Sequence, residues 1–276
     1  MRTTVTTRQG TGPAFDVTTA SAARIYDYLL GGKDHFTADR QAGYRLTEAL
    51  PGIVRACRDN RDFLQRAVRY LASQGIRQFL DIGTGLPAMG SVHEAAQQAA
   101  PGARVAYIDY DPVVLTHARA LLAGTPGVIA VPGDLRHPEA ITTDPDVRRH
   151  LDLTRPVAVL CVAVLHFITD AEQPRAITAR LMDAMMPGSW LAITHATADH
   201  VTEQAAADAR GVYDTASAPV TPRTLTEVTG LFDGLKLAEP GVTGAADWHL
   251  EIPPYRPHGQ EPRQETYIYA GVAMKH

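Results

Sequence analysis

The segment FLDIGTGLPA, residues 79–88, contains the residue types best suited to binding a ligand. Asp81 lies at the end of an apolar run, Gly83 and Gly85 follow it, and a helix-forming stretch begins at Ala88. Glycines let the backbone approach a ligand closely, and the N–H groups at a helix start are free to donate hydrogen bonds. The spacing G-x-G-x-x-A also matches the dinucleotide fingerprint, so this turn alone leaves the ligand open.

Acidic residues follow the next two predicted strands. Asp109 follows the strand 104–108, and Asp134 follows the strand 128–131. The carboxyl ends of parallel strands meet at one edge of a sheet, so these side chains are expected to gather beside the glycine turn. A carboxylate at Asp81 opposes a pyrophosphate but suits a ligand that carries an ammonium and a sulfonium, and Asp109 can accept both hydroxyls of a ribose. The order of these acids therefore favours S-adenosylmethionine over a dinucleotide.

Strands alternate with helices from residue 77 to residue 194. Strands are predicted at 77–82, 104–108, 128–131, 156–165 and 190–194, with helices at 88–99, 112–122 and 173–186. This alternation predicts a parallel sheet with right-handed crossovers. Beyond residue 195 the pattern predicts helices at 199–211 and 224–231 and closing strands at 235–239 and 266–274.

Three helices, at 22–30, 38–50 and 53–74, are predicted before the sheet. We expect residues 1–19 to be a flexible N-terminus, residues 20–75 a helical cap, and residues 76–276 a Rossmann-like domain. The cap is expected to lie against the sheet instead of folding as an independent domain.

Composition excludes several classes of protein. The 276 residues are 45% hydrophobic with a net charge of −4, which argues against a collagen-like chain, a coiled coil or binding of nucleic acid through bulk charge. No run of 18 apolar residues predicts a membrane span, and the first residues lack the apolar region of a secretory signal. Two cysteines far apart in sequence fit a reducing compartment, so the predicted location is cytoplasmic. The oligomeric state stays open.

Six stretches resemble a known family. They are ARIYDYLLGGKDHFTADR (23–40), RDNRDFLQRAVRYL (58–71), QFLDIGTGLP (78–87), VAYIDYDPVVLTHARALL (105–122), VAVLHF (162–167) and PGSWLAITH (187–195). The chain resembles class I S-adenosylmethionine-dependent methyltransferases, and more narrowly a former domain-of-unknown-function family later labelled S-adenosyl methyltransferase. The resemblance implies an α/β fold, with a Rossmann-like, seven-stranded, mostly parallel sheet whose last strand is antiparallel. It also implies cofactor contacts at Asp81, Gly83, Gly85, Asp109 and Asp134.

The candidate cofactor-binding residues lie in the glycine turn and at the strand ends. They are Asp81, Gly83, Thr84, Gly85, Leu86, Pro87, Asp109, Tyr110, Asp111, Gly133, Asp134, Leu135 and Ala163. Pro87 departs from the general methyltransferase pattern D-x-G-x-G-x-G, which has glycine at this position. Proline donates no N–H and fixes φ, so we expect the loop to hold the methionine end of the cofactor differently.

Three residues are candidates for catalysis. His166 and His195 lie at the ends of predicted strands, where an imidazole can deprotonate a hydroxyl or amine acceptor. The alternative is that each histidine only holds a loop. Tyr26 precedes the GGKD segment and is expected to touch the cofactor or the acceptor.

Candidate substrate residues come from three segments. Lys33, Asp34 and His35 follow two glycines and are predicted to close the site, or else to form a solvated run after a helix. Arg58 shares a predicted helix face with Arg55 and Arg61, which can meet a carboxylate or pair with neighbouring aspartates. The aromatic residues Tyr213, Trp248 and Tyr255 are expected either to line an acceptor pocket or to pack in the interior.

No metal site is predicted, because His195, Asp199 and His200 match no firm ligand spacing. The sequence as a whole predicts a methyltransferase acting on a small-molecule acceptor. Two alternatives stay open: a regulatory module that binds S-adenosylmethionine without turnover, and an NAD(P)-dependent oxidoreductase. A nucleic-acid methyltransferase is disfavoured, because the segment after the strand 156–165 reads LHFITD and carries no (D/N)-P-P-(Y/F) signature.

Overall fold

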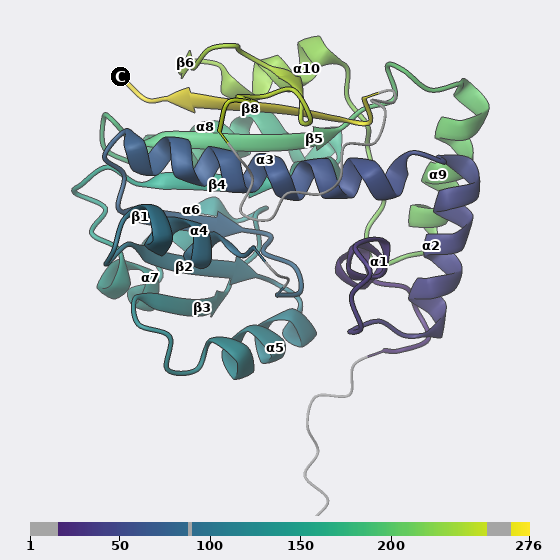
Figure 1. Cartoon of the computed structure of the whole chain (residues 1–276), viewed down its shortest axis with the longest axis horizontal. Coiled ribbons are helices and arrows are strands. Elements are labelled where there is room, and N and C mark those ends of the chain that lie inside the picture. Colours follow the sequence, from purple (N-terminus) through teal and green to yellow (C-terminus); the bar gives the residue numbers. More distant parts are fainter. Residues whose placement is uncertain (1–15, 88–89, 253–265) are drawn as a thin grey trace, which may run out of the picture.

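The computed structural model describes residues 16–87, 90–252 and 266–276. A single β-sheet lies at the centre of the protein (Figure 1). Five parallel strands form its centre in the order β3-β2-β1-β4-β5. Their bounds are β1 Gln78–Ile82, β2 Arg104–Asp109, β3 Val128–Pro132, β4 Ala158–Val162 and β5 Trp190–Ala196. The strand order reverses between β1 and β4, which is where open α/β sheets bind their ligands.

Three antiparallel strands close the sheet beside β5. The strand β8 (Ile268–Met274) pairs antiparallel with β5, and the short strands β6 (Lys236–Leu237) and β7 (Thr243–Gly244) both pair with β8. The predicted mostly parallel sheet with an antiparallel end is confirmed. A path of seven strands runs from β3 to β6, and β7 adds a two-residue strand that the sequence did not predict.

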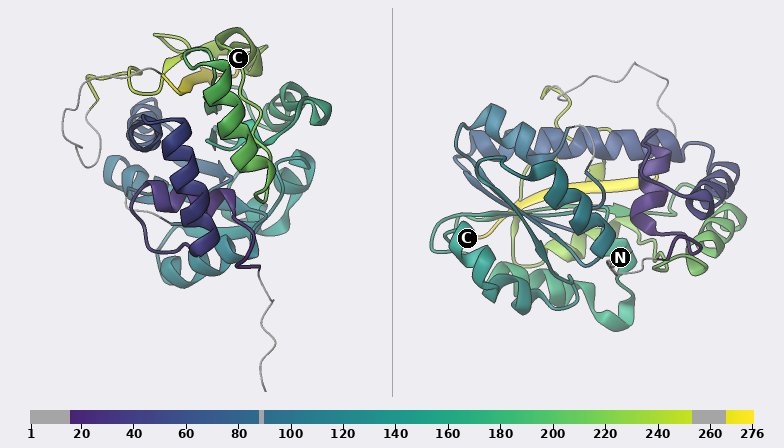
Figure 2. Two further views of the ribbon diagram at one scale, coloured as in Figure 1. Left: turned by 90° about the vertical axis from the view of Figure 1, so that its right-hand side faces the viewer. Right: turned by 90° about the horizontal axis from the view of Figure 1, so that it is seen from below.

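Helices cover both faces of the sheet (Figure 2), because successive strand residues point to opposite sides. Phe79 and Val105 face the side covered by α3 (Ile53–Ser73) and α4 (Val92–Ala99). Leu80 and Ala106 face the side covered by α6 (Pro138–Thr143), α7 (Pro145–His150) and α8 (Pro174–Asp183). Both faces are therefore buried, as the continuous apolar run of β4 indicated.

The remaining helices are α1 (Ala22–Leu29), α2 (Thr37–Ala49), α5 (Pro112–Leu122), α9 (Glu203–Asp214) and α10 (Leu225–Thr229). Most predicted elements are present with bounds that differ by a few residues. The short helices α6 and α7 were missed, although each begins with a proline at its first position. The strand β4 ends at Val162, before the predicted residue 165, because Ala163 has a φ of 55° and a 3₁₀ turn follows at Leu165–Phe167.

A helical cap stands beside the carboxyl edge of the sheet. Ile25 and Leu46, from α1 and α2, share an apolar cluster with Ala209 and Val212 from α9. The N-terminal end of α3 joins this cluster through Cys57, while the rest of α3 packs on the sheet. Figure 1 shows α1, α2 and α9 together at the right. We define the cap as α1, α2, residues 53–57 and α9, so it includes a helix far outside residues 20–75.

Candidate functional site

The turn after β1 contains two glycines whose surroundings differ. Gly83 and Gly85 have φ values of 74° and 64°, a region that other residues rarely adopt. A Cβ on Gly83 would lie 2.3 Å from Cγ2 of Val164, whereas a Cβ on Gly85 would meet no atom within 4 Å. Gly83 is thus required by packing against the segment after β4, and Gly85 exposes its backbone to open space.

Two buried carboxyl groups lie beside this turn. Asp109 accepts the backbone N–H of Gly85 at 2.9 Å and that of Asp111 at 3.0 Å. Burial raises the pKa of Asp81 to about 7, the Arg61 guanidinium opposes this rise, and the Asp109 carboxyl adds to it. Burial also raises the pKa of Asp109, against the two backbone hydrogen bonds. Two adjacent buried acids favour a cationic ligand, which would stabilise their charged forms.

The start of α4 differs from the prediction. The helix begins at Val92, and the N–H groups of Gly90 and Ser91 donate to the Glu94 carboxylate at 2.9 and 3.2 Å. A pyrophosphate at a helix start needs these amides free. The capped helix therefore disfavours the dinucleotide alternative.

A cavity of about 210 Å³ opens at the carboxyl edge of the sheet and extends beneath the cap. Nearly all predicted cofactor-binding residues line it, namely Asp81, Gly83, Thr84, Gly85, Leu86, Asp109, Tyr110, Asp111, Gly133, Asp134, Leu135 and Ala163. Pro87 instead lines an adjoining cavity that shares Arg61 and Asp81 with the first. The structure thus brings these side chains together, and their contact with a cofactor stays a prediction.

The rim near β3 carries an ion-pair cluster. Arg136 pairs with Asp134 at 3.2 Å and with Glu172 at 2.5 Å, so the Asp134 carboxylate is held in place. Gly133 has a packing duty as well, because a Cβ there would lie 2.6 Å from Cγ2 of Ile108.

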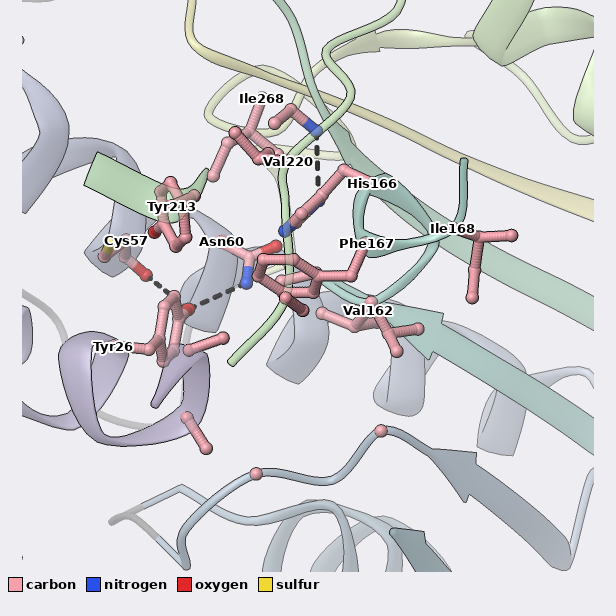
Figure 3. Close-up of a pocket in the computed structure, with 18 of the residues that line it drawn as sticks. Tyr26, Cys57, Asn60, Val162, His166, Phe167, Ile168, Tyr213, Val220 and Ile268 are labelled. Carbon is pink, nitrogen blue, oxygen red and sulfur yellow. Dashed lines mark hydrogen bonds between the residues drawn. The ribbon is translucent and has the colours of Figure 1, made fainter. Parts of the chain in front are cut away.

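The end of the cavity beneath the cap forms a chamber with mainly apolar walls (Figure 3). We define the chamber by Tyr26, Cys57, Asn60, Val162, His166, Phe167, Ile168, Tyr213, Val220 and Ile268. The Tyr26 hydroxyl donates to the Cys57 carbonyl at 3.1 Å and accepts from Nδ2 of Asn60 at 2.8 Å. Burial raises the pKa of Tyr26 well above its ordinary value, so the phenol stays neutral. The geometry gives Tyr26 a positioning role between α1 and α3.

His166 reaches the chamber from the 3₁₀ turn after β4. Its Nδ1 accepts the backbone N–H of Ala196 at 3.3 Å, and Figure 3 shows the other side of the ring directed into the chamber. Burial lowers the pKa of His166 well below its ordinary value, and His195 and Arg223 lower it further. The imidazole is therefore neutral.

His195 does not reach the cavity. Its Nδ1 donates to the carbonyl of Ala196 at 2.8 Å, and its Nε2 accepts from Arg223 at 2.9 Å. Arg223 also donates to the carbonyls of Leu165 and Ile168. Both ring nitrogens are occupied, so the geometry gives no support to the predicted catalytic role and makes His195 part of the support beneath His166.

The GGKDH segment folds around Asp27 of α1. Oδ2 of Asp27 accepts the backbone N–H of Asp34 at 2.9 Å and lies 3.1 Å from Nδ1 of His35. Lys33 and Asp34 are exposed, and none of Lys33, Asp34 and His35 lines the cavity. The geometry corresponds to the structural alternative for this segment.

Three arginines of α3 lie in different surroundings, a difference that the sequence did not resolve. Arg55 pairs with Asp59 at 2.7 Å, Arg58 lies outside the cavity lining, and Arg61 lines both cavities. Nε of Arg61 is buried without a hydrogen-bond partner among the described residues. The geometry therefore favours Arg61 over Arg58 for contact with a ligand.

Sequence reasoning missed Asn60, which is 1% exposed and lines the chamber. The signal was its helical spacing with Cys57 and Leu64, which places one amide side chain on an otherwise apolar face of α3. Tyr213 of α9 lines the chamber, as one alternative expected. Trp248 packs against Phe63 under α3 instead, and Tyr255 lies outside the described residues.

Within residues 16–87, 90–252 and 266–276, no three His, Cys, Asp or Glu side chains are grouped to hold a metal ion. No helix in this part of the chain is both long and apolar enough to span a membrane.

Comparisons with known proteins show which family the chain resembles over its length. A family model described as S-adenosyl methyltransferase matches residues 8–276. A crystal structure of a DUF574 family protein from Streptomyces avermitilis is 39% identical, with a TM-score of 0.84 over 94% of this chain and 99% of that chain. A candidate methyltransferase from Thermobifida fusca is 38% identical, with a TM-score of 0.85 over 94% of this chain and 96% of that chain. No curated protein matches this chain.

Proposed function

Because the chain belongs to the S-adenosyl methyltransferase family, we propose that it methylates a small molecule held in the chamber beneath the cap. Family membership establishes the enzyme as an S-adenosylmethionine-dependent methyltransferase. The proposal concerns the acceptor, which the family does not identify.

One observation carries the proposal. A single cavity is lined at one end by Gly85 and Asp109 and at the other by Asn60 and His166. The first end has the acids and open backbone expected for the cofactor, and the second has apolar walls with a few polar atoms. Small-molecule sites commonly combine apolar walls with a few placed polar groups. A donor and an acceptor bound at the two ends would share one space.

The described residues fit the cofactor. The Asp109 carboxylate keeps lone pairs beyond its two backbone hydrogen bonds, and these can accept ribose hydroxyls. Asp81, a buried acid that titrates near neutral pH, would keep its charge opposite a cation, and the open space at Gly85 leaves room for a ligand. When bound, S-adenosylmethionine supplies a methyl group activated by its sulfonium.

Neither alternative is favoured by an observation at the site. The buried Asp81 and the capped start of α4 oppose a pyrophosphate. Asn60 and His166 line the chamber, but no observation there favours binding without turnover. The two cysteines are free and buried, which supports the proposed cytoplasmic location.

The test has two stages. Calorimetric titration with S-adenosylhomocysteine measures cofactor binding. Incubation with a methyl-labelled donor and a cell extract, separated into small-molecule and macromolecular fractions, then locates the acceptor. Label in the small-molecule fraction supports the proposal. Label found only in protein or nucleic acid contradicts it.

A further inference from the structure

The tautomer of His166 decides what the ring offers the chamber. A backbone N–H can only donate, so Nδ1, which accepts from Ala196 at 3.3 Å, carries no proton. The ring is neutral because burial disfavours its charged form and lowers its pKa. The single proton therefore sits on Nε2. Thr221 fixes the backbone by donating its N–H to the His166 carbonyl at 2.7 Å. Toward the chamber, His166 offers an N–H donor and no free lone pair.

Asn60 offers the complementary group. Its Nδ2 donates to the Tyr26 hydroxyl at 2.8 Å, and its Oδ1 points toward the chamber. That oxygen is buried and has no hydrogen-bond partner among the described residues. Buried acceptors are rarely left unpaired, because their desolvation is not repaid. A ligand that brings a polar hydrogen would satisfy it.

None of the described side chains that line the chamber is ready to remove a proton. Burial raises the pKa of Cys57 to about 12 and the pKa of Tyr26 and Tyr213 above their ordinary values. Charged groups line the rest of the cavity. Among them, the Asp27 carboxylate already bonds to the backbone of Asp34 and to His35 in the loop 33–35. Asp81, Asp109, Asp111 and Asp134 lie on the cofactor side, and Arg61, Arg136 and Arg210 are cations. A hydroxyl acceptor must therefore lose its proton before it reacts.

The walls suit an apolar body that carries a ring. Phe167 and Tyr213 contact each other with ring centroids 5.7 Å apart and planes tilted by 57°, and Tyr26 adds a third ring (Figure 3). Val162, Ile168, Val220 and Ile268 supply the remaining apolar surface. Aromatic rings pack well against such walls.

We propose that the acceptor is a phenol that reacts as its anion, with the Nε2–H of His166 donating to the phenolate oxygen. This inference rests on the proposed methyl transfer to a small molecule. Asn60 Oδ1 accepts a second polar hydrogen of the same molecule. A phenol, unlike an aliphatic alcohol, is acidic enough to release its proton to water before binding. His166 thus holds and stabilises the nucleophile and does not act as a base.

The step balances without a protein base. The phenolate oxygen forms a bond to the methyl carbon while the carbon–sulfur bond breaks, and the electron pair of that bond stays on sulfur. The negative charge of the phenolate and the positive charge of the sulfonium cancel. The phenolic proton has already passed to solvent.

The probe is p-nitrophenol, whose neutral and ionised forms absorb at different wavelengths. It is titrated by absorbance across a pH series into protein saturated with S-adenosylhomocysteine. We expect about tenfold tighter binding of the anion than of the neutral phenol, since hydrogen bonds to charged groups are the stronger ones. His166→Leu removes the donor and should abolish this preference. His166→Gln keeps an N–H donor, cannot serve as a base, and should retain it.

Matched measurements separate the possible failures. His137→Gln changes an exposed histidine outside the cavity and should behave like the wild type. Calorimetry with S-adenosylhomocysteine and a melting curve check that each variant binds the cofactor and is folded. If the wild type does not bind the cofactor, both the proposed function and the phenolate proposal are overturned. Intact cofactor binding without anion preference overturns the phenolate alone. A protonated Nδ1 of His166, read from nitrogen chemical shifts of the labelled ring, also overturns it.

Discussion

The carboxylate of Asp109 accepts the backbone N–H of Gly85 at 2.9 Å, and this bond ties the end of β2 to the turn after β1. A side chain that is expected to hold the ribose thus also shapes the loop beside it. If this carboxylate binds the ribose as expected, ligand binding and loop geometry are coupled at one residue.

Asp109→Ala removes both the hydrogen bond to Gly85 and the expected contact with the ribose. It is expected to weaken S-adenosylhomocysteine binding at least about tenfold. Asp109→Asn keeps an oxygen for Gly85 but loses the charge, so its loss should be smaller. Isothermal calorimetry measures both. Asp144→Asn is the control, because it exchanges one good N-cap for another at α7. Equal affinities in Asp109→Ala and the wild type would contradict this assignment.

Asp81→Asn is expected to stabilise the ligand-free protein while weakening cofactor binding. Asp81 titrates near pH 7 when folded and near pH 4 in an unfolded chain. Between these values folding takes up a proton, so the penalty of the buried charge grows as pH rises from about 4 to about 7 and is complete above it. The substitution should raise the free energy of unfolding by on the order of 4 kcal/mol at pH 8 and leave it nearly unchanged at pH 4.

Urea unfolding at a series of pH values measures this gain, with Asp183→Asn as the exposed control. A gain that does not change with pH would show that Asp81 carries no buried charge. Unchanged affinity for S-adenosylhomocysteine would separate Asp81 from the cofactor site.

The two glycines of the turn should respond differently to alanine. Gly83→Ala adds a Cβ that clashes with Val164, so it should cost more than about 2 kcal/mol of stability. Gly85→Ala meets no atom and should cost about 1 kcal/mol for its positive φ. Gly102→Ala is the matched control, since Gly102 has a φ of 82°, open space and a place away from the cavity.

Gly85→Ala should lower S-adenosylhomocysteine affinity beyond any effect of Gly102→Ala, because its new methyl group faces the cavity. Denaturant unfolding and calorimetry give the two readouts. Equal affinities in these two variants would mean that the ligand does not approach Gly85.

The His195–Arg223 pair should make the protein sensitive to acid. Burial, with the Arg223 guanidinium adding to it, lowers the pKa of His195 to about 4, whereas a histidine in an unfolded chain titrates near 6.5. The unfolded chain therefore binds more protons between these values, and stability falls as pH drops from about 6.5 to about 4. His195→Gln should flatten this part of the curve, measured as the difference from the wild type because Asp81 acts in the opposite direction. An unchanged slope would contradict the prediction.

Arg223→Met removes the donor shared by His195, Leu165 and Ile168. We expect the free energy of unfolding to fall by about 3 kcal/mol, because buried acceptors are left unpaired. Since these bonds hold the turn that carries His166, anion preference of the p-nitrophenol probe should fall as well. Thermal melting and the absorbance titration test the two effects separately.

Much of the fold was determined by sequence within short windows. The alternation of apolar strands with helices, the turn at Gly83 and the proline start of α5 each depend on neighbours a few residues away. The parallel sheet, and the gathering of nearly all the candidate cofactor-binding residues around one cavity, were therefore predictable. The short helices α6 and α7 were missed because six residues are too few to show a helical period.

Tertiary structure decided which of several equivalent residues lines the cavity. Arg58 and Arg61 are alike in sequence, and only the placement of α3 across the sheet edge directs Arg61 to the cavity. His166 and His195 were both predicted at strand ends, but Arg223 donates to the ring of His195 and leaves the Nε2 side of His166 open to the chamber. The inclusion of α9 in the cap and the meeting of Asn60 with His166 depend on contacts between distant segments. Local propensity carries no information about such contacts, so the sequence determined the scaffold and the three-dimensional packing determined the chamber.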